Sequence, residues 1–77
     1  MKIEDWERID HSKNNIEWRH DSGIRIILSK QANYYVLSLY DASGIEHHTT
    51  SDYNKSKMEA LAAKWQRQYN THLRRLS

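Results

Sequence analysis

The sequence contains no cysteine and no proline, and only two glycines among its 77 residues. Without cysteine, neither a disulfide framework nor a thiolate zinc site can stabilise so short a chain. Without proline, nothing forbids continuous hydrogen-bonded ladders between strands. A chain of this length folds as one domain and leaves little room for an enclosed catalytic pocket. We therefore expect one compact domain spanning residues 1–77, with its stability coming from a single core.

Long apolar segments are also missing. No stretch approaches the roughly 20 apolar residues that a membrane-spanning helix needs. The opening residues 1–6 are acidic and contain no apolar run, so we expect no signal peptide and no membrane association. These features predict a soluble, cytoplasmic protein.

Recognisable catalytic spacing is absent as well. The carboxylates form no acid and base pair of familiar geometry, and no glycine-rich phosphate loop occurs. His47 and His48 are adjacent on an expected strand, so their side chains point to opposite faces, and no histidine has a helical i, i+4 partner. We predict a non-enzymatic protein with no catalytic residues, no metal site and no cofactor.

The positive charge is concentrated in the last third of the chain. The net charge is only +2, yet residues 54–77 contain six basic side chains and a single acidic one, Glu59. The first 53 residues carry an excess of acid. Such asymmetry points to a polyanion or an acidic protein surface as a partner, with a solvated basic face as the alternative.

The middle of the chain, residues 16–50, has the alternation and turn composition of an antiparallel meander. Apolar and polar residues alternate over 16–20, residues 24–29 form a second expected strand, and residues 34–40 are rich in aromatic and branched side chains. Residues 21–23 and 41–44 each end in glycine, which suits tight turns. Residues 45–50 should return as the last strand of a hairpin.

A C-terminal helix is predicted for residues 56–75. Ser56 and Glu59 have the spacing of a capping box. Apolar residues then recur at spacings of three and four and predict one buried stripe, formed by Met58, Leu61, Ala62, Trp65, Tyr69 and Leu76. The stripe should dock on the sheet, which makes Trp65 and Tyr69 core residues rather than ligand contacts.

Strand parity predicts which side chains face this helix. The covered set is Trp18, Ile24, Ile26, Leu28, Tyr35, Leu37 and Leu39. The opposite, uncovered set is Arg19, Arg25, Ile27, Tyr34, Val36, Ser38 and Tyr40. The open face would then carry two tyrosines and two arginines.

The N-terminal segment, residues 1–15, is ambiguous. Ile3, Trp6 and Ile9 recur every three residues, which suits a short helix, but a strand or an extended arm fits equally well. The predicted fold class is therefore α+β, an antiparallel β-meander of three to four strands packed on one C-terminal helix, with a short N-terminal helix as an option.

The pattern over residues 24–70 resembles two families of small nucleic-acid-binding modules. It combines a Tyr35-x-Leu37 strand, the Gly44 turn, a strand ending in threonine, and a helix opening with residues 56–60. This is similar to the arm-type DNA-binding domain of phage integrases, where the resemblance implies a sheet laid in the major groove. It is also similar to the second half of a double-stranded RNA-binding domain, where it implies helix lysines on phosphates.

Two non-enzymatic functions follow from these expectations. The first is nucleic-acid binding, through the basic helix or through the arginine and tyrosine side chains of the open sheet face. The candidate contact residues are Lys55, Lys57, Lys64, Arg67, Arg19, Arg25, Tyr34 and Tyr40. The second is a protein-interaction adaptor or inhibitor of the kind that phages and other mobile elements encode, with an acidic partner or a homodimer formed through an edge strand.

Overall fold

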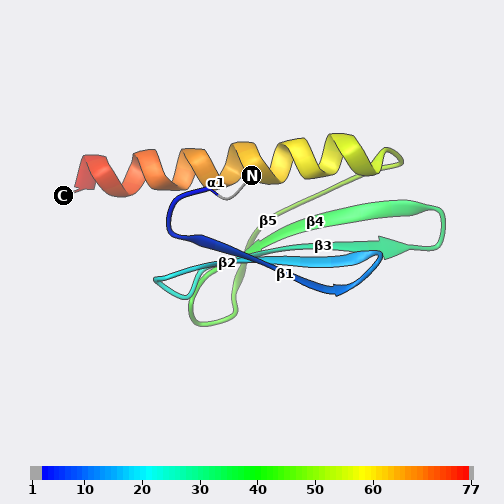
Figure 1. The fold of residues 1–77 in the computed structure, drawn as a ribbon, viewed down its shortest axis with the longest axis horizontal. Helices are drawn as coiled ribbons and strands as arrows, with labels where there is room; N and C mark the ends of the chain where they lie inside the picture. The colour runs from blue at the N-terminus through cyan, green and yellow to red at the C-terminus, as the bar shows by residue number, and fades with distance from the viewer. Residues whose placement is uncertain (1–2, 77) are drawn as a thin grey trace.

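The computed structural model describes residues 3–76 of the chain, with side chains through residue 71. Five antiparallel strands form one meander in which each strand pairs with the next, and a single long helix follows (Figure 1). The elements are β1 (Trp6–Ser12), β2 (Asn15–His20), β3 (Arg25–Gln31), β4 (Tyr34–Tyr40), β5 (Glu46–Asp52) and α1 (Lys55–Leu76). The α+β class is confirmed.

The N-terminal segment forms a fifth strand, so the short-helix option and the count of three to four strands were both wrong. β1 pairs with β2 along its whole length, with Trp6 opposite His20 and Asp10 opposite Ile16. An irregularity in register follows Asp10. The preceding residues turn sharply through Asp5, whose φ is 68°, and the N–H of Trp6 donates to the carbonyl of Ile3.

The parity of the strands is as predicted. Trp18 and the aliphatic residues expected to face the helix are buried or pack against the core, and α1 contributes Met58 and Ala62. The most enclosed side chains include Ile26, Leu28 and Leu37, each with no exposed surface. Trp6, from the N-terminal segment for which the sequence left helix, strand and arm open, is 1% exposed. The covered face of the sheet is therefore the core of the protein.

Two turns of the same design connect the strands at one end of the sheet. In each, a glycine in the left-handed region, Gly23 or Gly44, closes the turn by donating its N–H to a carbonyl three residues back. The carboxylate of Asp41 accepts the N–H groups of Ser43 and Ile45. The Gly23 turn uses a histidine ring nitrogen in the equivalent place. The predicted turns are confirmed.

The helix starts earlier than the capping-box pattern indicated. Asn54 is the N-cap, since its side-chain oxygen accepts the N–H of Lys57 at 3.1 Å. Asn54 is itself oriented by Asp52, which accepts its backbone N–H at 2.9 Å. Ser56 lies inside the first turn, and Glu59 reaches toward Arg8 instead of back to the helix start.

α1 packs against β3, β4 and β5 and leaves the β1 side of the covered face more open. Its later turns hold the N-terminal segment, because Asn70 accepts a hydrogen bond from Trp6 Nε1 and donates one to the carbonyl of Glu4, each at 3.0 Å. None of the described helical residues forms a segment with the length and apolarity needed to cross a bilayer.

Candidate nucleic-acid interface

The predicted basic residues at the start of α1 are partly engaged by the protein itself. The Lys55 ammonium donates to the carbonyl of Lys13 at 2.9 Å, which ties the helix start to the β1–β2 turn. Lys57 is exposed and forms an ion pair with Asp52 at 3.2 Å. The pKa of Asp52 is lowered, first by the backbone N–H of Asn54 and then by Lys57. Lys57 is therefore partly neutralised.

Further along the helix, Lys64 and Arg67 are exposed, and neither forms an ion pair with any described residue. They alternate with residues of the buried stripe, so they lie on the outer side of α1 along with Lys57. A rise of 1.5 Å per residue separates Lys57 from Lys64 by roughly 10 Å along the axis. The outer side of the helix thus presents an ordered row of cations.

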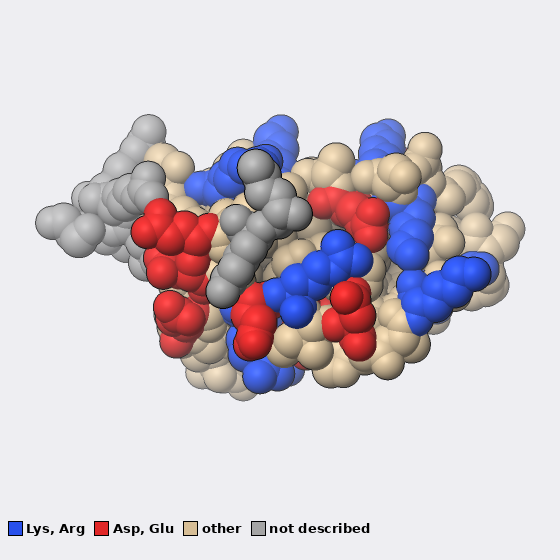
Figure 2. Space-filling model, viewed as in Figure 1, with Lys and Arg blue, Asp and Glu red and all other residues tan. Residues whose placement is uncertain are grey.

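The fold extends this row with two lysines that the sequence analysis did not select. Lys13 lies in the turn that Lys55 contacts, and the backbone N–H of Lys30 donates to Asn14 of the same turn. The β1–β2 turn, the end of β3 and the start of α1 therefore meet at one end of the molecule. Figure 2 shows Lys and Arg side chains both along the helix margin and at this end. Only strand pairing brings them together, so no local sequence signal marks them.

On the open sheet face, the structure groups three of the four predicted contact residues. Arg19 and Arg25 are direct partners across β2 and β3, and Arg25 is the partner of Tyr40 across β3 and β4. The Arg25 guanidinium lies 5.8 Å from the centre of the Tyr40 ring. Tyr34 is six residues from Tyr40 on the same strand, roughly 20 Å away. The two tyrosines therefore do not form one stacking platform.

A buried carboxylate occupies the same face. Glu17 is 5% exposed and accepts hydrogen bonds from Arg19 and from His11 Nε2, both at 2.9 Å. Burial raises the pKa of Glu17, but the bonds from His11 and Arg19 outweigh burial, and its pKa is lowered overall. The charge of Arg19 is accordingly committed to Glu17, which weakens the open face as a site for anions.

His47 and His48 lie on opposite faces of β5, as the strand pattern predicted. His47 bonds to Asp41 at 2.8 Å on an exposed surface and lowers the pKa of that carboxyl, ahead of smaller effects from the turn backbone. His48 lies near the ring of Trp65 on the other face. Within residues 3–71, no three side chains of metal-binding type come together.

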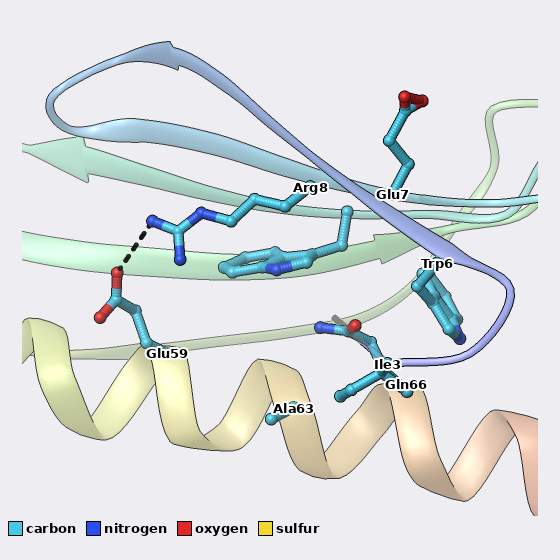
Figure 3. Close-up of a pocket in the computed structure, with 8 residues that line it drawn as sticks. Ile3, Trp6, Glu7, Arg8, Glu59, Ala63 and Gln66 are labelled. Carbon is cyan, nitrogen blue, oxygen red and sulfur yellow. Dashed lines mark ion pairs between the residues drawn. The ribbon is translucent and has the colours of Figure 1, made fainter. Parts of the chain in front are cut away.

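Sequence reasoning missed a cleft between β1 and α1 (Figure 3). It has a volume of about 430 Å³ and is lined mainly by apolar groups, including Trp6, Trp18 and Ala63. Arg8 reaches from β1 across the cleft toward Glu59 of α1, with a nitrogen to oxygen distance of 3.7 Å. One sequence feature could have indicated this cleft. Gln66 is a polar residue that follows Met58 and Ala62 at a spacing of four, so it lies on the buried side of α1.

The chain matches no known protein-family model, and neither the curated proteins nor the solved structures contain a significant match to it. The resemblance to integrase arm-type and double-stranded RNA-binding modules stays a prediction.

Proposed function

We propose that the protein binds nucleic acid, with the outer side of α1 contacting backbone phosphates. The observation that carries this proposal is the pair Lys64 and Arg67, which are exposed and unpaired among the described residues on the face of α1 that points away from the sheet. Phosphate contacts need accessible cations in a row and no enclosed pocket. A domain of this size can provide such a surface.

The basic end of the sheet would continue the same contact. Lys13 and Lys30 are exposed and lie beside the start of α1. A phosphate backbone that runs along α1 toward its N-terminus would therefore also contact these two lysines. The open sheet face is the weaker alternative, because Glu17 occupies Arg19 and the exposed Glu7 stands opposite Arg19 on β1. The helix side therefore has the stronger positive field.

Binding is tested by fluorescence anisotropy with labelled DNA and RNA, both duplex and single-stranded, at two salt concentrations. Reversal of the two free cations, Lys64→Glu with Arg67→Glu, should weaken binding to all sequences alike. The slope of log affinity against log salt should fall by about 0.9 for each lost phosphate contact with duplex DNA. Both residues are exposed, so stability should change by no more than about 0.5 kcal/mol for each substitution.

Arg25→Glu is the matched control for Arg67→Glu alone, since each reverses one arginine and Arg25 lies on the open face of the sheet. It should leave affinity nearly unchanged if the helix makes the contact. A larger loss from Arg25→Glu than from the helix pair would transfer the interface to the open face. No binding of the wild-type protein to any of the probes at low salt would reject nucleic-acid binding and leave the protein-interaction adaptor as the remaining function.

A further inference from the structure

The cleft between β1 and α1 has an amide group in its lining to which no described residue bonds. Gln66 is 2% exposed, lines the cleft, and makes no hydrogen bond with any described residue. Figure 3 shows its amide pointing from α1 into the space below β1. Because Gln66 lines the cleft, water or an occupant of the cleft can bond to its amide. An occupant that displaces the water must offer a hydrogen-bonding group to Gln66, since the amide would otherwise be left unpaired.

The cleft walls define the shape and polarity of such an occupant. Trp6, Trp18 and Ala63 provide apolar surface around the amide, and the volume falls within the range of protein sites for small groups. An aromatic side chain with a polar tip satisfies both features, because its body is apolar and its tip forms a hydrogen bond. Tyrosine and tryptophan have this character.

β1 supplies a backbone surface directly beside the cleft. It is an outer strand of the sheet, and the carbonyl of Asp5 accepts the N–H of Asp21. Hydrogen bonding toward β2 alternates along the strand from this pair, so the backbone groups of Arg8 and Asp10 point outward. A peptide that pairs with this edge would place the side chain opposite Arg8 on the same face as Arg8, which is the cleft side.

The charge around the cleft favours a basic partner. Among the residues that line the cleft, Glu7 and Glu59 are acidic and Arg8 is basic, and Asp5 and Asp10 lie next to them on β1 and its preceding turn. Arg8 is half-exposed, and its 3.7 Å contact with Glu59 is longer than a hydrogen bond. An occupant can therefore displace the contact with Glu59, while the 3.0 Å hydrogen bond from Arg8 Nε to Asp10, whose partners both lie on β1, need not break.

We propose that β1 and the cleft form a docking site for an extended, basic segment of another protein. The segment adds to the edge of β1 as a sixth strand and inserts one tyrosine or tryptophan, whose polar tip bonds to Gln66. This site is separate from the basic side of α1, and the excess of acidic groups at the cleft favours a basic peptide over a nucleic acid. The proposal is therefore independent of nucleic-acid binding.

The test is a titration of ¹⁵N-labelled protein with the peptide Ac-Lys-Thr-Lys-Tyr-Lys-Thr-Lys-NH₂, followed by NMR. The backbone amide signals of Arg8 and Asp10 and the side-chain amide signals of Gln66 should shift together, and exchange of the two backbone amides should slow. Replacing the peptide tyrosine by alanine should weaken binding at least about tenfold, as expected for an anchor residue. Replacing the peptide lysines by glutamate should abolish binding.

Two protein variants separate recognition from folding. Gln66→Leu removes the amide while keeping an apolar body, so it should retain or raise the melting temperature and weaken peptide binding about tenfold. Gln68→Leu makes the same chemical change at an exposed position of α1 outside the cleft and should bind as wild type. Equal affinity of the Gln66→Leu variant and the wild-type protein would reject the role of the amide.

Three other results would overturn the proposal. No shifts at millimolar peptide would show that the edge does not accept a strand. N-acetyl-tyrosinamide could shift the Gln66 signals as the peptide does, while neither probe shifts the signals of Arg8 and Asp10. That result would make the cleft a small-molecule site. Light scattering could show that the mass rises with protein concentration, and the same NMR signals could shift in the absence of peptide. Together these results would show that the edge of β1 binds a second copy of this chain.

Discussion

The two faces of the sheet are stabilised by different kinds of interaction. Beneath α1, Leu28 and Leu37 have no exposed surface. On the open face, the neighbouring Val36 is half-buried, and the groups that are enclosed are polar, namely Glu17 and Ser38. The covered face therefore gains its stability from apolar burial, whereas the open face depends on ion pairs and hydroxyl groups. The first kind of stabilisation is insensitive to pH, and the second is not.

The largest effect is expected from removing the indole that closes the covered face. Trp6→Ala should destabilise the protein by about 3 to 5 kcal/mol, because the side chain is 1% exposed and its Nε1 bonds to Asn70. Trp65 is only half-buried, so Trp65→Ala should cost clearly less. Urea unfolding of both variants measures the difference. An equal loss would show that the β1 side and the β5 side of the covered face contribute alike to the core.

A neighbouring pair on β4 compares the two faces directly. Leu37→Ala on the covered face should cost about 2 to 5 kcal/mol, since it creates a cavity that α1 and the sheet cannot close. Val36→Ala on the open face should cost roughly 1 kcal/mol, because the side chain is already partly in water. Chemical denaturation of each variant gives both values. Similar losses would indicate that a partner or a second copy covers the open face.

The same contrast explains which strands could be predicted from sequence. β2, β3 and β4 were predictable because β2 alternates and β3 and β4 are rich in branched and aromatic residues, which line the core on their inward face. β1 was not, because its inward positions are Trp6, Arg8 and Asp10, of which only the first is apolar, and Arg8 lies half-exposed at the cleft. Hydrophobic periodicity reports burial, so a strand that the helix fails to cover lacks the pattern.

Local motifs at the candidate site were predictable in part. The cations of α1 were found because helical spacing alone places them outside the apolar stripe. The helix start was misplaced, since Asn54 precedes Ser56 and is oriented by Asp52, a contact that depends on how β5 ends. Lys13 and Lys30 join the basic surface only through pairing of distant strands. Spacing in sequence contains no information on that proximity.

The open face should reveal its ionic character at low pH. The pKa of Glu17 is lowered below its ordinary value of 4.5. Its contribution is therefore fully present above that pH and is lost as the pH falls through the folded-state pKa. Glu17→Gln should cost about 1 to 2 kcal/mol at neutral pH, near the low end for charged hydrogen bonds because Arg19 is half-exposed. The difference from wild type should shrink below pH 4.5.

The difference between variants is the quantity to measure, since the pKa values of Asp41 and Asp52 are lowered too and shift the raw stability curve in the same direction. Thermal unfolding at a series of pH values, with the exposed Glu46→Gln as the control, isolates Glu17. The difference in stability between the wild-type protein and Glu17→Gln could also stay constant across the pH series. The buried side chain would then contribute through packing rather than through its charge.

The smallest effect, and the sharpest comparison, concerns two adjacent threonines of β5. Thr49 faces the open side, where its hydroxyl lies 3.1 Å from that of the buried Ser38. Thr50 faces the covered side opposite Leu37. Thr49→Val leaves the Ser38 hydroxyl without this partner and should cost about 0.5 to 1.5 kcal/mol.

Thr50→Val adds apolar surface beside Leu37 and should be neutral or stabilising, because its hydroxyl bonds to no described residue. Val and Thr have nearly the same shape, so the two substitutions differ only in the face that each side chain meets. Opposite signs in paired thermal unfolding experiments would confirm that hydroxyl pairing stabilises the open face and apolar contact the covered one. A change in stability of the same sign for both variants would show that the two faces do not differ in this way at β5.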